Sequence, residues 1–157
     1  MEREKFTVQL AAVDALPVLF FGIAAISLGM KLQSTLFSAG AMVCLLAGAG
    51  KVLWKLILAL KMKDIPLLGA QLHYLMPLGF LLMIIGTFSS DRALVKTLLR
   101  SAVQIPNVLF FTLAVIGLFG MILCAKKYDR HDVKGNWIEQ IINTITQGCV
   151  MIGILLL

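Results

Sequence analysis

Ionisable and amide side chains occur at few places within the apolar part of this sequence. Asp14, Lys51 and Lys55 stand near one end of long apolar runs, and His73 lies inside another. A charge at the centre of a membrane span costs at least ~2.5–3.5 kcal/mol, so each such residue needs a partner, a cavity or a place near the edge. These residues are the first candidates for binding chemistry.

His73 combines a titratable side chain with a local gap in helix bonding. Pro77, four residues later, lacks the N–H that would bond the carbonyl of His73, so the sequence predicts a kink and a free acceptor there. Gln71 and Tyr74 make this stretch polar. Because histidine changes its charge near neutral pH, one interpretation is that His73 carries a proton. The alternative is a histidine that only bonds to a neighbouring helix.

A polar face runs along the last apolar segment. Gln140, Asn143 and Gln147 recur at spacings of three and four residues, with Glu139 and Thr146 beside them. Residues at these spacings share one face of a helix. We expect the face either to bond to neighbouring helices or to border water, and its polarity leaves open a model in which this segment does not insert fully.

Depth brings these groups into one layer. At 1.5 Å per residue, Asp14, Lys51, His73 and Gln140 each lie roughly 25 Å from the far end of their segments. That depth is close to the cytoplasmic edge of a hydrocarbon core about 30 Å thick. The sequence therefore predicts a polar vestibule with these candidate ligand-binding residues: Asp14, Lys51, Lys55, Gln71, His73, Tyr74, Glu139, Gln140 and Asn143.

Two interpretations of the charged residues in this layer stay open. In the first, Asp14 forms an ion pair with Lys51 or Lys55, because the two segments are adjacent in sequence and the residues lie at one level. In the second, Asp14 caps a helix that continues through Pro17, while both lysines extend towards the interface and Trp54 sits in the interfacial belt.

Long apolar helices are the elements that would position these residues. Of the 157 residues 60% are apolar and 14% are charged, against ~45–50% and ~25% in an average soluble domain. The apolar runs are residues 16–30, 36–50, 65–88, 108–125 and 141–157, and a span needs about 20 residues. The sequence predicts one all-α integral membrane domain over 1–157, a bundle of five transmembrane helices, or four if the last does not insert.

Two basic segments lie between the predicted spans. In residues 91–105, Arg92, Lys96 and Arg100 recur every four residues opposite an apolar side, which is typical of a helix in the outer interface ending near Pro106. A patch for an anionic ligand is the alternative. Residues 51–63 either form the inner end of the second span or lie in the interface as an amphipathic peptide.

The distribution of basic residues predicts the orientation. With five spans, ten of the 14 Lys and Arg residues fall on the N-terminal side, and basic loops stay in the cytoplasm. We expect a retained first span, a multi-pass protein of the cell membrane, a cytoplasmic N-terminus and a C-terminus on the outer face. We expect the net charge of +6 to orient the protein in the membrane and to attract anionic lipids of the bilayer. We expect no nucleic acid as a partner.

No motif for catalysis or metal binding appears. Cys44, Cys124 and Cys149 lie far apart inside apolar runs, without histidines at ligand spacing. The acids and the histidine of residues 129–132 are adjacent in sequence, which favours a solvated loop over a metal site. We therefore expect no cofactor, no metal ion and no catalytic residues, so an enzyme is the less favoured class.

Small residues mark faces on which helices approach closely. They are Gly40, Cys44 and Gly48 in the second run, and Gly117, Gly120 and Cys124 in the fourth. Such faces pack helices within a bundle or against a second copy or partner membrane protein. The leading hypothesis is binding or transport of a small molecule, ion or lipid through the vestibule. The competing one is an accessory or assembly subunit without activity of its own.

Overall fold

The structure is a computed structural model that describes residues 8–60, 65–127 and 133–157. All regular structure in these residues is helical: α1 (Val8–Leu32), α2 (Thr35–Ala59), α3 (Pro66–Ala70), α4 (Leu72–Phe88), α5 (Arg92–Ala102), α6 (Asn107–Lys127) and α7 (Val133–Leu156). Five stretches are long and apolar enough to cross a membrane: α1, α2, α3 with α4, α6 and α7. The prediction of a helical chain with five long apolar helices is confirmed, and the last segment is one of them.

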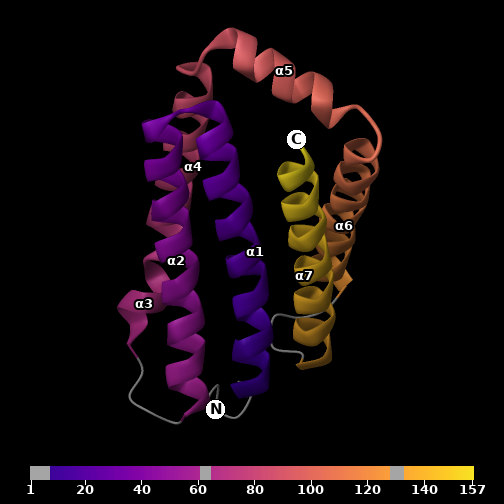
Figure 1. Cartoon of the computed structure of the whole chain (residues 1–157). Helices are drawn as coiled ribbons and strands as arrows, with labels where there is room; N and C mark the ends of the chain where they lie inside the picture. Colours follow the sequence, from indigo (N-terminus) through magenta and orange to yellow (C-terminus); the bar gives the residue numbers. More distant parts are fainter. Residues whose placement is uncertain (1–7, 61–64, 128–132) are drawn as a thin grey trace.

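The long helices pack against one another in the order α4, α2, α1, α7, α6. In Figure 1, α2, α1, α7 and α6 stand side by side, and α4 lies behind α2. This order is set by packing of α2 against α4, α1 against α2, α7 against α1 and α6 against α7. The helices α4 and α6 are the first and last in this order. The helix α5 passes across one end of the bundle, from α4 to α6 (Figure 1). We call the end that carries α5 the α5 end, and the opposite end, where α1 begins, the inner end.

A tight turn joins α1 to α2. Gln33 adopts a left-handed backbone with a φ of 51°. The amides of Gln33 and Ser34 then donate to the carbonyls of Met30 and Gly29, both at 3.2 Å, which is the Schellman pattern at a helix C-terminus. Ser34 also caps α2 by accepting from the amide of Phe37 at 3.2 Å. The break between the apolar runs 16–30 and 36–50 is confirmed, and it makes α1 and α2 antiparallel neighbours.

Small residues bring α2 and α4 into close contact. A Cβ added at Gly40 would lie 2.6 Å from the carbonyl oxygen of Gly79, and a Cβ at Gly86 would overlap the amide of Phe37. The thiol of Cys44 donates to the carbonyl of Met76 at 3.8 Å. The small residues predicted on the second run therefore pack against a neighbouring helix of the same bundle.

The other small-residue face is used in the same way. A Cβ at Gly117 of α6 would overlap the hydroxyl of Thr146 on α7, and Thr146 is 1% exposed. On α2, a Cβ at Gly48 would lie 3.0 Å from Cγ1 of Val18 on α1. Gly48 and Gly117 thus pack against neighbouring helices of the same chain.

The amphipathic helix predicted between the third and fourth spans is confirmed as α5. Asp91 caps it, with a carboxylate oxygen accepting from the amide of Ala93 at 2.7 Å. Pro106 lies between α5 and α6, as predicted. Asn107, 3% exposed, donates from Nδ2 to the carbonyl of Ser101 at 3.0 Å and to that of Leu156 at 3.5 Å. This amide ties the end of α5 to the end of α7.

Asp14 lies inside α1, which begins at Val8, so the interpretation in which it caps the helix is wrong. The third apolar segment forms α3 and α4, which are separated at Gln71, and Pro77 lies inside α4. Most of residues 51–63 continue α2 to Ala59 as its inner end. The cluster of residues 129–132 lies outside the described residues.

Candidate functional site

A pocket of about 170 Å³ lies between four helices and extends from Asp14 to Phe80. Its lining comes from α1, α2, α4 and α7, so it needs residues from the whole length of the sequence. We call it the inner pocket; it is lined by Asp14, Pro17, Val18, Phe21, Cys44, Gly48, Lys51, Val52, Leu72, Met76, Phe80, Asn143 and Gln147.

A buried ion pair closes one side of the inner pocket. Nζ of Lys55 lies 2.7 Å from Oδ2 of Asp14, and the two residues are 7% and 5% exposed. The pair forms because α1 and α2 are antiparallel, which places the second turn of α1 beside the last turns of α2. The predicted ion pair is confirmed, with Lys55 as the partner of Asp14.

Lys51 is the basic residue that lines the inner pocket. It lies one turn before Lys55 on the same face of α2. Lys55 experiences the charges of Asp14, Lys51 and Glu139, so two acids and two bases share this region. Among the described residues, the one ion pair is that between Asp14 and Lys55. Asp14, which lines the pocket, is thus paired with Lys55, and Lys51 places a second ammonium group at this end of the pocket.

The helix α7 supplies the amide groups of the site. Asn143 and Gln147 line the inner pocket. Gln140 stands on the same face one turn earlier and is 6% exposed, and its Oε1 has no hydrogen-bond partner among the described residues. Leaving a buried acceptor unbonded costs about 1–3 kcal/mol. A polar face of α7 thus meets other helices and the pocket at the level of the charged residues.

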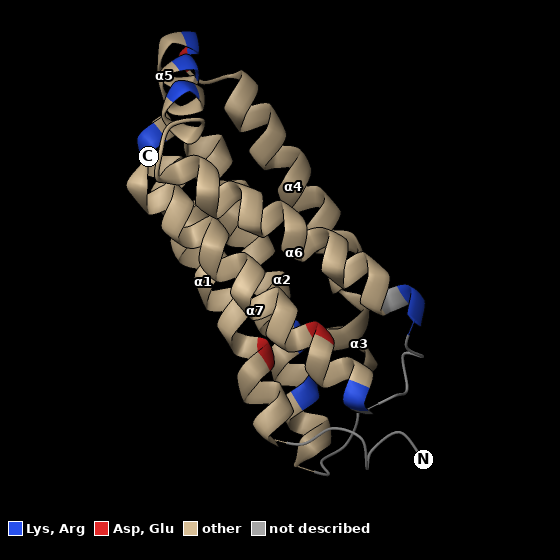
Figure 2. Ribbon diagram, turned by 90° about the vertical axis from the view of Figure 1, so that its right-hand side faces the viewer, with Lys and Arg blue, Asp and Glu red and all other residues tan. Residues whose placement is uncertain are grey.

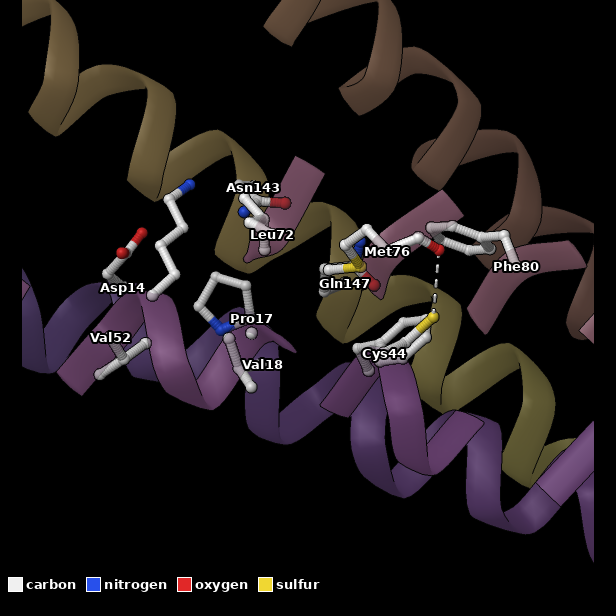
Figure 3. Close-up of a pocket in the computed structure, with 13 residues that line it drawn as sticks. Asp14, Pro17, Val18, Cys44, Val52, Leu72, Met76, Phe80, Asn143 and Gln147 are labelled. Atoms are coloured by element: carbon white, nitrogen blue, oxygen red, sulfur yellow. Dashed lines mark hydrogen bonds between the residues drawn. The ribbon is translucent and has the colours of Figure 1, made fainter. Parts of the chain in front are cut away.

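The inner pocket has a polar end and an apolar end. Figure 3 shows Asp14 at one end and Phe80 at the other, with Asn143 and Gln147 of α7 between them. At the apolar end, the rings of Phe21 and Phe80 meet edge to face with centroids 6.1 Å apart. A molecule in this space would meet charged and amide groups along one part of its length and hydrocarbon along the other.

Three of the predicted site residues on the third span lie elsewhere. The amide of Gln71 donates to the carbonyl of Ala47 at 3.4 Å and so joins α4 to α2. His73 and Tyr74 are exposed on the outside of α4, Tyr74 at 77%. The reason is helical phase, because a helix turns 100° per residue and α4 directs Leu72, Met76 and Phe80 into the pocket.

The structure distributes the remaining predicted residues unevenly around the inner pocket. Asp14, Lys51 and Asn143 line it, Lys55 holds Asp14, and Gln140 and Glu139 lie on the turn of α7 before Asn143. Residues that sequence reasoning left out of the site are Phe21, Cys44, Met76, Phe80 and Gln147. Only Gln147 carried a signal, since it continues the polar face of the last segment.

Neither a metal site nor a known relative identifies the chemistry of the inner pocket. Within residues 8–60, 65–127 and 133–157, no group of three His, Cys, Asp or Glu residues is placed to hold a metal ion. Comparison of the chain with protein-family models, curated proteins and solved structures found no match.

Proposed function

We propose that this chain is a multi-pass membrane protein that binds a small amphipathic anion in the inner pocket. Support for membrane insertion comes from the five long apolar helices. Their outer faces carry large apolar side chains, such as Leu46 at 61% and Phe119 at 63% exposure. Lys, Arg, Asp and Glu gather towards the two ends of the bundle, and the stretch between them is uncharged (Figure 2). Lipid is the solvent that matches this surface.

The orientation proposed from the basic residues gives the first prediction. In a variant whose three native cysteines are replaced by alanine, we introduce Thr97→Cys on α5 or Lys126→Cys at the end of α6, both exposed positions. In intact cells a membrane-impermeant thiol reagent should modify Cys at 97 and leave Cys at 126 unmodified until the cells are opened. The reverse pattern would overturn the proposed cytoplasmic N-terminus.

The ligand class follows from the two ends of the inner pocket. Lys51 offers a cation, and Asn143 and Gln147 offer N–H donors, whereas the nearest acid is engaged by Lys55. Hydrogen bonds between charged partners contribute roughly 1.5–3 kcal/mol, about twice a neutral bond. Phe21 and Phe80 suit an apolar tail. The observation that carries the proposal is that one pocket combines a lysine outside the ion pair with an aromatic end.

We favour this proposal over the competing accessory-subunit hypothesis. That hypothesis depended on small-residue faces that would meet a partner protein, and Gly40 and Gly117 are instead packed against α4 and α7. The inner pocket, with Lys51, Asn143 and Gln147 among its lining residues, instead offers space for a ligand.

Octanoate is the probe for the second prediction. With the protein in lipid nanodiscs, octanoate should raise the unfolding temperature more than octylamine or octanol at equal concentration, because ligands stabilise the state that binds them. Lys51→Met should weaken the octanoate effect about tenfold in apparent Kd, as expected for loss of a charge-assisted bond. Lys31→Met, at the α5 end, is the matched control and should leave it unchanged.

Two outcomes of this titration would contradict the proposal. A stronger effect of octylamine would mean that Asp14 rather than Lys51 sets the ligand charge. Equal losses in Lys51→Met and Lys31→Met would mean that octanoate acts through the lipid and not through the inner pocket.

A further inference from the structure

A second cavity, of about 230 Å³, lies at the α5 end of the bundle. We call it the α5 cavity. Its lining comes from α1, α4, α5, α6, α7 and Leu157, and every lining residue except Thr87 is apolar. On α5, Val95, Leu98, Leu99 and Ala102 form its roof. Apolar cavities of roughly 150 Å³ stay dry and take up apolar molecules, so this larger space favours hydrocarbon over water.

The α5 cavity reaches the surface of the molecule beside a row of positive charge. Leu99 lines it and is 64% exposed. Lys96 and Arg100 each follow a lining residue directly, and Arg92 stands one turn earlier; all three are exposed. Figure 2 shows these bases together on α5. Basic residues at a membrane surface attract anionic headgroups, and the arginine fork suits phosphate.

We infer that the α5 cavity holds an acyl chain of an anionic phospholipid whose phosphate is bound by Lys96 and Arg100. Charge complementarity selects this occupant, because an uncharged lipid would use the cavity and leave the basic row unpaired. The arrangement also explains why α5 lies flat over the bundle. The apolar side of α5 covers an acyl chain that enters between the helices α4 and α6. The site is distinct from the inner pocket, because no residue lines both spaces.

Native mass spectrometry of the purified protein with added phospholipid tests this inference. Phosphatidylglycerol and phosphatidylcholine with identical acyl chains are titrated separately. The wild type should retain one phosphatidylglycerol more tightly than phosphatidylcholine. Ala102→Phe fills the cavity and should weaken that first lipid about tenfold, the cost of expelling about two methylene groups. Ala12→Phe makes the same substitution at an exposed position of α1 that does not line the cavity, and it is the matched control.

A second experiment tests the role of the bases on α5, with two variants that change the net charge by the same amount. Replacing Arg92, Lys96 and Arg100 with Gln should reduce the preference for phosphatidylglycerol at least about fivefold. Replacing Lys126, Lys127 and Lys134 with Gln, at the inner end, should preserve it. Lys51→Met should also leave lipid retention unchanged, which separates this site from the inner pocket.

Three results would overturn the inference. Equal losses in the two triple variants would show that net charge alone attracts the lipid. Unchanged retention in a folded Ala102→Phe protein would show that the cavity holds no chain, and if that variant does not fold, Ala102→Leu replaces it. A wild-type dimer without bound lipid would show that a second copy covers the α5 end.

Discussion

Asp14→Asn should lower the unfolding free energy in detergent by about 3–5 kcal/mol, the range for removing one partner of a buried ion pair. The variant leaves the ammonium of Lys55 inside the bundle, where that residue is 7% exposed and lies 2.7 Å from Oδ2 of Asp14 in the wild type. The pair therefore differs from exposed pairs, which contribute ~0–1 kcal/mol. Reversible unfolding in mixed micelles, followed by circular dichroism, measures the loss.

The double variant Asp14→Asn with Lys55→Met should recover part of that loss, because no charge is then left buried without a partner. Lys51→Met is the matched control, one turn away on the same helix and outside the ion pair. It should change stability by less than about 1 kcal/mol. If the effects of Asp14→Asn and Lys55→Met are additive, the two residues are independent and the pair does not hold the wall of the inner pocket.

Gly40→Ala should destabilise the protein by about 1–3 kcal/mol, although alanine favours helix more than glycine does. The added Cβ would lie 2.6 Å from the carbonyl oxygen of Gly79 and 2.7 Å from the amide nitrogen of Met83, and backbone does not yield as a side chain does. The helices α2 and α4 would have to separate, as in other overpacked contacts. The same unfolding assay measures the change.

Gly120→Ala makes the identical substitution where space exists. A Cβ there would have Cγ2 of Ile142 at 3.6 Å as its nearest neighbour, an ordinary contact. Its stability should therefore equal the wild type or exceed it by up to about 1 kcal/mol, the intrinsic preference of a helix for alanine. A Gly40→Ala protein as stable as the Gly120→Ala protein would contradict the close packing of α2 on α4.

Hydropathy and charge position were sufficient to predict the helices and one of their contacts. The apolar runs predicted five long helices, and the four-residue spacing of Arg92, Lys96 and Arg100 predicted α5. The ion pair of Asp14 followed from two local facts, equal depth and a short connection between consecutive helices. Such inferences succeed because they depend on the sequence of one or two neighbouring segments.

The rotation and order of the helices were not predictable from the sequence. The polar group at Gln71, His73 and Tyr74 suggested a pocket-lining stretch, yet α4 directs Leu72, Met76 and Phe80 inward. The nearly uniform hydropathy of α4 leaves its phase undetermined by pattern, and its glycine contacts with α2 determine it instead. Likewise, packing of α7 against α1 brings Asn143 to the pocket, and no local signal encodes a contact between the two ends of the chain.

Photolabelling with a diazirine-bearing octanoate tests the central claim most directly, because it locates the ligand. The protein is placed in nanodiscs, and the octanoate carries the diazirine at the end of its acyl chain. This diazirine should attach at the apolar end of the inner pocket, on peptides that contain Met76 or Phe80. An excess of unlabelled octanoate should prevent this labelling, and Lys51→Met should reduce it. Labelling confined to lipid-facing positions such as Phe119, unaffected by competitor and by Lys51→Met, would contradict the claim that the inner pocket binds an amphipathic anion.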